Sequence, residues 1–165
     1  MYKRQPQGTP FGPSTFDKAG PTALASSARL SLDIRCEDKE TEAFFTELDA
    51  FAPKYLAEHS ERIFGKRMSL EQVTNCYRPC LRKREGYAPL LHTKVSLEGP
   101  YATHFWDENK DARDPPANWR DARMLFQLSI PHLWFSGGLC GFVINILDCQ
   151  IMSEDGGRAP PVCPF

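Results

Sequence analysis

The chain has 165 residues, of which 41% are hydrophobic and 25% are charged, and its formal net charge is -1. This length and composition are typical of one globular domain with a hydrophobic core and exclude a wholly disordered chain. The near-neutral charge excludes a general polycation, so any affinity for phosphate must come from local clustering of charge. No apolar run approaches the ~20 residues of a membrane span, so we expect no membrane association.

Residues 1–29 are rich in Pro, Gly, Ser, Thr and Ala and contain few large apolar side chains. We expect a disordered or loosely attached tail over this segment. Its basic residues precede no apolar run, which is not the pattern of a secretory signal. The first patterned segment is Leu30–Cys36, where apolar and polar residues alternate with the period of a half-buried strand.

After this strand the apolar period becomes that of a helix. The repeating side chains are Phe44, Leu48, Phe51 and Tyr55, with a second apolar row beside them. The spacing predicts an amphipathic helix, which Asp38 or Thr41 can cap and which Gly65 can end. Pro53 cannot donate a backbone hydrogen bond, so we expect either a kink there or two helices, the second having Pro53 in its first turn.

Several strand-like segments follow the helical region. They are Val73–Leu81, Leu90–Leu97, Thr103–Trp106, Met124–Ile130, Leu133–Phe135 and Leu139–Met152. Ser136-Gly137-Gly138 predicts a hairpin turn, the polar segment 107–123 a long loop, and 153–165 a loose C-terminal tail. The prediction is therefore a mainly β domain over residues 30–152, a small barrel or sandwich of about five or six strands with one inserted helical region.

Charge is unevenly distributed along this near-neutral chain. Between residues 62 and 94 the cations are Arg62, Lys66, Arg67, Arg78, Arg82, Lys83, Arg84 and Lys94, and the acids are Glu71 and Glu85, a local charge of about +6. If residues 78–84 form a regular strand, Arg78, Arg82 and Arg84 share one face. Such clustering favours a polyanion, because each neutralised phosphate releases condensed counterions.

Aromatic side chains lie close to these cations in the sequence. They are Tyr77, Tyr87, Tyr101, Phe105 and Trp106. Aromatic faces stack on exposed bases at roughly 1–3 kcal/mol per base without selecting the base. Cations interleaved with aromatic rings therefore indicate single-stranded nucleic acid as a ligand, although a solvated charged face over core aromatics has the same composition.

Metal binding and catalysis have weaker support in the sequence. Cys76 and Cys80, with His92 and His104 downstream, offer zinc ligands, but on a strand the two cysteines would lie roughly 13 Å apart. The chain has none of the common nucleophile, phosphate-loop or metalloprotease motifs. We expect no metal, no cofactor and no catalytic residue. Its six cysteines form no dense framework, which predicts an intracellular, reducing compartment without distinguishing nucleus, organelle or viral factory.

The order of several short motifs is similar to that of a known family. These are Leu30-Ser31-Leu32-Asp33, Phe44-Phe45-Thr46-Glu47-Leu48-Asp49, Phe64-Gly65-Lys66, Tyr77-Arg78-Pro79, Pro89-Leu90-Leu91, Phe105-Trp106-Asp107, Leu133-Trp134-Phe135 and the glycine-containing run that ends at Gln150. In this order the chain resembles the OB-fold single-stranded DNA-binding proteins of large nucleocytoplasmic DNA viruses, which are similar to the phage replication type. The resemblance covers about residues 30–152.

The resemblance implies an OB-like barrel with an inserted helix and a basic, aromatic-lined groove. It would place Lys66, Tyr77, Arg78, Lys94 and Trp106 in or beside that groove. Phage members carry a strongly acidic C-terminal tail that recruits partners and competes for the groove. Here the residues from 153 onward contain only two acids against one arginine, a departure that puts such recruitment in doubt.

We therefore predict a non-catalytic protein that binds single-stranded DNA largely independently of sequence, in replication, repair or recombination, as a viral protein. The nucleic-acid-binding residues predicted are Lys66, Arg67, Tyr77, Arg78, Arg82, Lys83, Arg84, Tyr87, Lys94 and Trp106. RNA is an alternative ligand, and replication proteins and a second copy of the chain are further candidate partners. The alternative function is a structural or protein-interaction β-sandwich that binds no nucleic acid.

Overall fold

The computed structural model describes residues 7–11, 13–14, 29–120 and 122–153. Its strands are β1 (Gln7–Gly8), β2 (Arg29–Arg35), β3 (Tyr77–Arg78), β4 (Leu81–Arg82), β5 (Leu90–Ser96), β6 (His104–Trp106), β7 (Arg123–Ser129), β8 (Leu133–Ser136), β9 (Leu139–Phe142) and β10 (Asn145–Ser153). Its helices are α2 (Lys39–Glu58), α3 (Ser60–Phe64) and α4 (Leu70–Cys76). No helix among these residues is long and apolar enough to cross a membrane.

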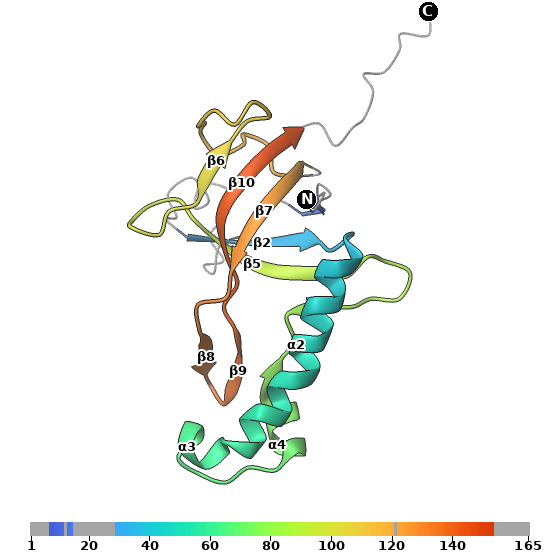
Figure 1. Cartoon of the computed structure of the whole chain (residues 1–165), viewed down its shortest axis with the longest axis vertical. Coiled ribbons are helices and arrows are strands. Elements are labelled where there is room, and N and C mark those ends of the chain that lie inside the picture. The colour runs from blue at the N-terminus through green and yellow to red at the C-terminus, as the bar shows by residue number, and fades with distance from the viewer. Residues whose placement is uncertain (1–6, 12, 15–28, 121, 154–165) are drawn as a thin grey trace, which may run out of the picture.

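Seven strands form one mixed sheet in the order β1-β7-β10-β5-β2, with β4 also paired to β5 and β6 to β10. β10 runs parallel to β5 and β6 and antiparallel to β7, and β7 and β10 cross β2 and β5 (Figure 1). Within the described residues β2 and β7 do not pair with each other. The N-terminal segment contacts both of them instead: β1 pairs with β7, and Ser14 forms a bridge to Ser31 of β2. The fold is mostly β and OB-like, as predicted, but its barrel is open and it has more strands than expected.

The alternation of apolar residues builds the core of this sheet. Leu91, Thr93 and Val95 of β5 are fully buried, whereas the residues between them are half-buried on the outer face. Leu32 of β2 and Met124 of β7 are buried in the same core. Each large apolar side chain removed from water in this way stabilises the fold by roughly 1.5–3 kcal/mol.

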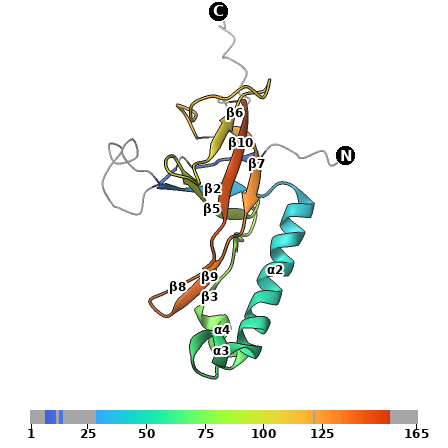
Figure 2. The same ribbon diagram turned by 60° about the vertical axis from the view of Figure 1, so that its left-hand side comes forward.

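A second, smaller core holds an extension that we call the arm, made of α3, α4, β3, the β8–β9 hairpin and the C-terminal half of α2. Its core residues include Leu56, Val73, Tyr77 and Cys140. β3, β9 and β8 form a separate three-stranded sheet. Both views show the arm extending away from the seven-stranded sheet (Figures 1 and 2).

The predicted amphipathic helix is confirmed as α2, and Asp38 is its cap. The Asp38 carboxylate accepts a hydrogen bond from the backbone N–H of Thr41 at 2.9 Å. Pro53 lies inside the continuous helix, which ends at Glu58, so the alternative of two helices divided at Pro53 is wrong. Gly65, in the left-handed region at φ 70°, ends the separate helix α3 and not α2.

The side of α2 that faces the protein is mainly the second apolar row, that of Phe45, Ala52 and Leu56, and Leu48 of the first row also packs against the core. Phe45, Ala52 and Leu56 are buried, whereas Phe44 and Phe51 are 54% and 59% exposed. Both rows have helical spacing, and the sheet that would select between them is not visible in a local sequence window.

Two of the predicted strands are wrong in part. Val73–Leu81 is not one strand, because the Ser69 and Gln72 side chains form a capping box that starts α4, leaving only β3 and β4 as two-residue strands. Arg78, Arg82 and Arg84 therefore do not share one regular strand. Leu139–Met152 is divided into β9 and β10, which belong to different sheets.

Part of the expected N-terminal tail belongs to the sheet. Gln7 and Gly8 pair with Met124 and Arg123 of β7, and the following Thr9 is fully buried. The remainder of the two expected tails, at 1–6, 12, 15–28 and 154–165, lies outside the described residues.

Candidate nucleic-acid interface

Two neighbouring antiparallel strands bring basic side chains from distant parts of the sequence together. In the register of β2 and β5, Asp33 lies opposite His92 and Ser31 lies opposite Lys94. Arg29 precedes this row on β2, and Arg82 of β4 pairs beside the first residue of β5. We call Arg29, Asp33, Arg82, His92 and Lys94 the basic strand face.

Asp33 fixes two of these side chains in place. Its carboxylate oxygens lie 2.7 Å from His92 Nδ1 and 3.5 Å from Arg82 Nη1. The hydrogen bond with His92, together with the nearby positive charges of His92, Arg82 and Lys94, lowers the pKa of Asp33. The face therefore has three cations, Arg29, Arg82 and Lys94, around one ionised carboxylate that also contacts the His92 ring.

Lys94 is the most buried cation of the basic strand face. Its Nζ donates a hydrogen bond to Ser31 Oγ at 2.6 Å. Burial, followed by the positive charge of Arg29, lowers the pKa of Lys94 to about 8. A bound phosphate would offset the cost of burying the charged ammonium, because a nearby anion stabilises the charged form of Lys94.

Asn145 of β10 lies beside Lys94 in the sheet. The two residues are Cα partners in the parallel pairing of β10 with β5. Asn145 Oδ1 is buried and accepts no hydrogen bond from the part of the chain described. A buried acceptor without a partner costs about 1–3 kcal/mol, and since this oxygen is shielded from solvent it is not placed to contact a ligand in this structure.

Exposed tyrosines lie in the loops at the two ends of β5. Tyr87, in the loop before it, is 69% exposed, and Tyr101, in the loop after it, is 79% exposed. The guanidinium carbon of Arg84 lies 5.1 Å from the centroid of the Tyr87 ring. The seven residues of β5 span roughly 20 Å at the rise of a strand, a length within the reach of several nucleotides.

Four of the predicted cations lie away from the basic strand face. Lys66 and Arg67 connect α3 to α4 in the arm, and Arg78 lies on β3, which pairs with β9. Lys83 is directed to α2, where its Nζ lies 3.2 Å from Thr46 Oγ1 and 3.8 Å from a Glu42 carboxylate oxygen. These cations are close in sequence but do not form one surface, because the chain passes here from the three-stranded sheet, which contains β3, to the seven-stranded sheet, which contains β4.

The predicted stacking role of Tyr77 is wrong in this structure. Its side chain is buried, and its hydroxyl donates a hydrogen bond to Asp49 Oδ1 at 2.7 Å. Burial, followed by this hydrogen bond, raises the pKa of Tyr77. The Asp49 carboxylate also accepts the backbone N–H groups of Cys80 and Leu81, at 2.9 and 3.2 Å, so this cluster anchors α2 to the β3–β4 segment.

Trp106 lies farther along the same sheet. It is opposite Gln150 on β10, five residues and roughly 17 Å from the position of Asn145 beside Lys94. The half-buried indole donates from Nε1 to Asp148 Oδ1 at 2.9 Å, and it lines a hollow of about 480 Å³ with Lys110 and Gln127. Trp106 thus remains accessible to a ligand, in a hollow of its own.

The sequence interpretation misses Arg29 and Asp33 and considers His92 only as a metal ligand. It places Arg29 in the tail, although this residue continues the alternation of Leu30–Cys36 by one position. Pairing the alternating segments 29–35 and 90–96 as antiparallel neighbours would have placed these polar positions on one face. Within the described residues no group of three or more His, Cys, Asp or Glu side chains is arranged to hold a metal ion.

No protein-family model matches the chain, and no curated protein is significantly similar to it in sequence. Among solved structures, the fold is similar to that of gp2.5, a single-stranded DNA-binding protein encoded by bacteriophage T7. The TM-score is 0.53 over 96% of this chain and 95% of that chain, and the sequences are 10% identical. At this identity the similarity establishes the fold: the chain shares the OB-type architecture of a phage single-stranded DNA-binding protein.

Proposed function

We propose that this protein binds single-stranded DNA, without catalysis and largely independently of base sequence, through the basic strand face. The observation that carries the proposal is the cross-strand cluster of Arg29, Arg82 and Lys94 on an OB-like sheet. Phosphates would lie against these cations, and bases would stack on Tyr87 and Tyr101 at the two ends of β5. The fold similarity to gp2.5, described as a single-stranded DNA-binding protein, supports this proposal.

The biological setting is part of the same proposal. Sequence-independent binding suits a protein that coats or captures transiently exposed strands in replication, repair or recombination inside the cell. Replication proteins would be natural partners, RNA is the alternative ligand, and the resemblance to proteins of large DNA viruses remains a prediction from the sequence.

A fluorescence-anisotropy titration of a labelled thymidine oligomer tests the proposal. We expect binding at low salt that weakens as salt rises, with similar affinity for oligomers of mixed sequence and a preference over duplex DNA. Arg82→Glu should weaken binding, whereas Lys54→Glu, which reverses an exposed lysine of α2, should not. No binding to any single strand at low salt would contradict the function.

The alternative function, a protein-interaction module that binds no nucleic acid, has its own supporting observation. Phe44 and Phe51 are large aromatic side chains left more than half exposed on α2. The titration separates the two functions, because an interaction module without nucleic-acid binding shows no salt-sensitive complex with oligonucleotides.

A further inference from the structure

The exposed aromatic side chains of α2 form a stripe along one side of the helix. Phe44, Phe51 and Tyr55 are 54%, 59% and 40% exposed, and their spacing of seven and four residues places them on one side of the helix. The rings of Phe51 and Tyr55 lie 5.6 Å apart between centroids. The stripe extends over eleven residues, roughly 16 Å of helix, and it plays no part in the core that α2 forms with Phe45, Ala52 and Leu56.

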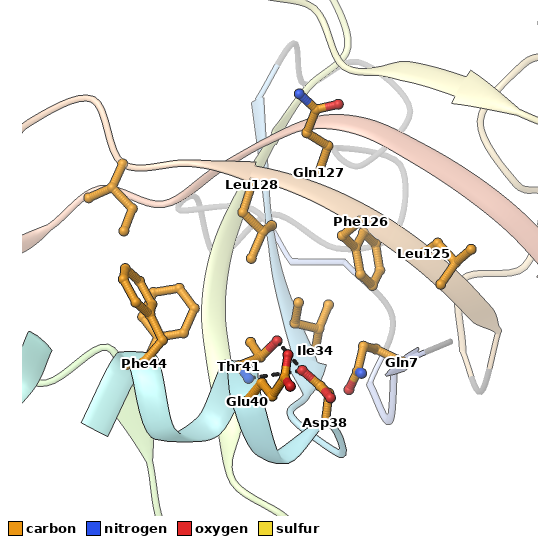
Figure 3. A pocket seen from close by; sticks show the side chains of 12 residues that line it. Gln7, Ile34, Asp38, Glu40, Thr41, Phe44, Leu125, Phe126, Gln127 and Leu128 are labelled. Atoms are coloured by element: carbon orange, nitrogen blue, oxygen red, sulfur yellow. Dashed lines mark hydrogen bonds between the residues drawn. The ribbon is translucent and has the colours of Figure 1, made fainter. Parts of the chain in front are cut away.

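Beside the N-terminal half of this stripe is a groove between α2 and β7, with a volume of about 740 Å³. Phe126 and Leu128 extend from β7 toward the first turns of α2, where Asp38, Glu40 and Phe44 lie (Figure 3). The residues that line the groove are largely apolar and include two carboxylates and no cation. The groove therefore continues the apolar stripe and adds negative charge to it.

Carboxylates also follow one edge of the stripe along the helix. At 100° per residue, Glu40, Glu47 and Glu58 lie within about 60° of the aromatic residues. These glutamates are exposed and make no ion pair within the described ranges of the chain, and Lys54 is the one cation close to them on α2. We call Glu40, Phe44, Glu47, Phe51, Tyr55 and Glu58 the acidic helix face.

Stability of the helix does not explain these features together. Glu40, in the first turn, is favourable to the helix dipole, but Glu58 lies in the last turn, where a negative charge is unfavourable and where α2 has no basic residue. Exposed Phe side chains add nothing to the helix dipole. A surface with an apolar stripe and an acidic edge is instead complementary to a segment that has apolar side chains on one side and cations beside them.

We propose that the acidic helix face and the adjoining groove bind a basic amphipathic segment of a partner protein, lying along α2. Its apolar side chains would cover Phe44 and Phe51, and its Lys or Arg side chains would pair with Glu40, Glu47 and Glu58. Nucleic acid is excluded from this surface by charge. A second copy presenting the same face is also disfavoured, because the carboxylates would oppose each other. The proposal goes beyond DNA binding and does not depend on it.

The test uses the full chain and a fluorescein-labelled peptide of leucine and lysine, about 14 residues long so that it covers the stripe. We expect saturable binding, seen as a rise in anisotropy, that weakens about tenfold in Phe51→Ser and in Glu47→Lys. Lys54→Glu should strengthen it severalfold, because it replaces the one cation of α2 close to these glutamates with a further carboxylate. A peptide in which glutamate replaces lysine should not bind.

Matched variants elsewhere on the surface control this experiment. Tyr101→Ser removes a more exposed ring, and Glu98→Lys reverses an exposed carboxylate in the same loop; both should leave peptide affinity unchanged. Circular dichroism checks that Phe51→Ser retains the helix. Equal losses in the controls, or equal binding of the acidic peptide, would overturn the proposal.

Two further measurements on the same protein test for other occupants of this surface. If sedimentation shows a dimer that Phe51→Ser dissociates, the occupant is a second copy, which overturns the assignment to a partner. If removal of residues 1–6, which contain Lys3 and Arg4, increases peptide affinity about tenfold, the chain's own N-terminal segment occupies the surface, with the same consequence. Oligonucleotide titrations on the same variants show separately whether DNA binding stands.

Discussion

The basic strand face and the acidic helix face are opposite in charge and are built in different ways. The basic strand face combines residues from three strands, and Asp33 and Ser31 hold Arg82, His92 and Lys94 by hydrogen bonds and ion pairs. The acidic helix face comes from one continuous helix, and its glutamates are exposed and unpaired within the described residues. Cations fixed by neighbours are suited to a regularly spaced polyanion, whereas free carboxylates around an apolar stripe are suited to a protein segment that adapts to them.

The largest effect should come from the residue that supports both faces. Asp49 on α2 accepts hydrogen bonds from the Tyr77 hydroxyl and the backbone N–H groups of Cys80 and Leu81. We expect Asp49→Ala to lower the free energy of unfolding by about 3 kcal/mol, because a buried hydroxyl and two backbone donors lose their acceptor. Chemical denaturation monitored by circular dichroism measures this.

Asp49→Asn keeps an acceptor and should retain part of that stability. If Asp49→Ala unfolds at the same denaturant concentration as the parent, Asp49 does not connect α2 to the β3–β4 segment in solution. The two faces would then be independent of this cluster.

The second effect separates two arginines that are close in sequence but lie on different sheets. Arg82→Glu should weaken oligonucleotide binding about 30-fold at low salt, since it places a carboxylate beside Asp33 on the basic strand face. Arg78→Glu, in the arm, should weaken it much less. Fluorescence anisotropy at several salt concentrations should also give a shallower salt dependence for the Arg82 variant.

Equal losses in the two arginine variants would contradict this division of the surface. The arm would then contribute to the same binding path as the basic strand face. A stability measurement on both variants checks that the loss in affinity comes from lost contacts with DNA and not from unfolding of the protein.

The third effect is a pH dependence specific to Lys94. Its pKa is lowered to about 8 in the free protein, and a bound phosphate favours the ammonium, so binding raises that pKa. Above pH 8 the free protein must take up a proton to bind, and affinity should fall by up to about tenfold per pH unit. Below about pH 7 Lys94 is charged in both states and contributes no pH dependence.

Titrations of the oligonucleotide from pH 6.5 to pH 9.5 (roughly the range on either side of this pKa) measure the effect. Lys94→Arg should remove this dependence, because a guanidinium stays charged throughout. The same decline in both proteins would assign it to another group.

The contrast between the two faces also explains which features the sequence could predict. The strands Leu30–Cys36 and Leu90–Leu97 and the helix cap at Asp38 follow from local patterns and agree closely with the structure, whereas Gly65 ends the short helix α3 and not α2. The basic strand face does not follow from local patterns, because only the register of β2 with β5 brings Arg29 and Lys94 together. Register is set by the whole sheet and by the turns around it.

A local window was also insufficient for Tyr77 and for the outer side of α2. Tyr77 looked like a stacking residue because it is next to Arg78, but its partner Asp49 lies 28 residues earlier in the chain. The aromatic stripe of α2 had the spacing of a core row, and it is exposed because the adjacent row packs against the protein instead. In both cases the deciding contact is long-range, and neither propensity nor periodicity contains it.

The smallest effect concerns Lys83, which is next to Arg82 and Arg84 in the sequence but contacts α2 in the structure. Its Nζ lies 3.8 Å from Glu42 and 3.2 Å from Thr46, and both charged side chains are substantially exposed. Exposed ion pairs contribute little, so Lys83→Ala should change the free energy of unfolding by less than about 0.5 kcal/mol. Because the ammonium is directed to the helix, the same variant should reduce oligonucleotide affinity about twofold, far less than Arg82→Ala. A loss equal to that of Arg82→Ala would mean that Lys83 leaves Glu42 when DNA binds, and that the basic strand face extends to the edge of α2.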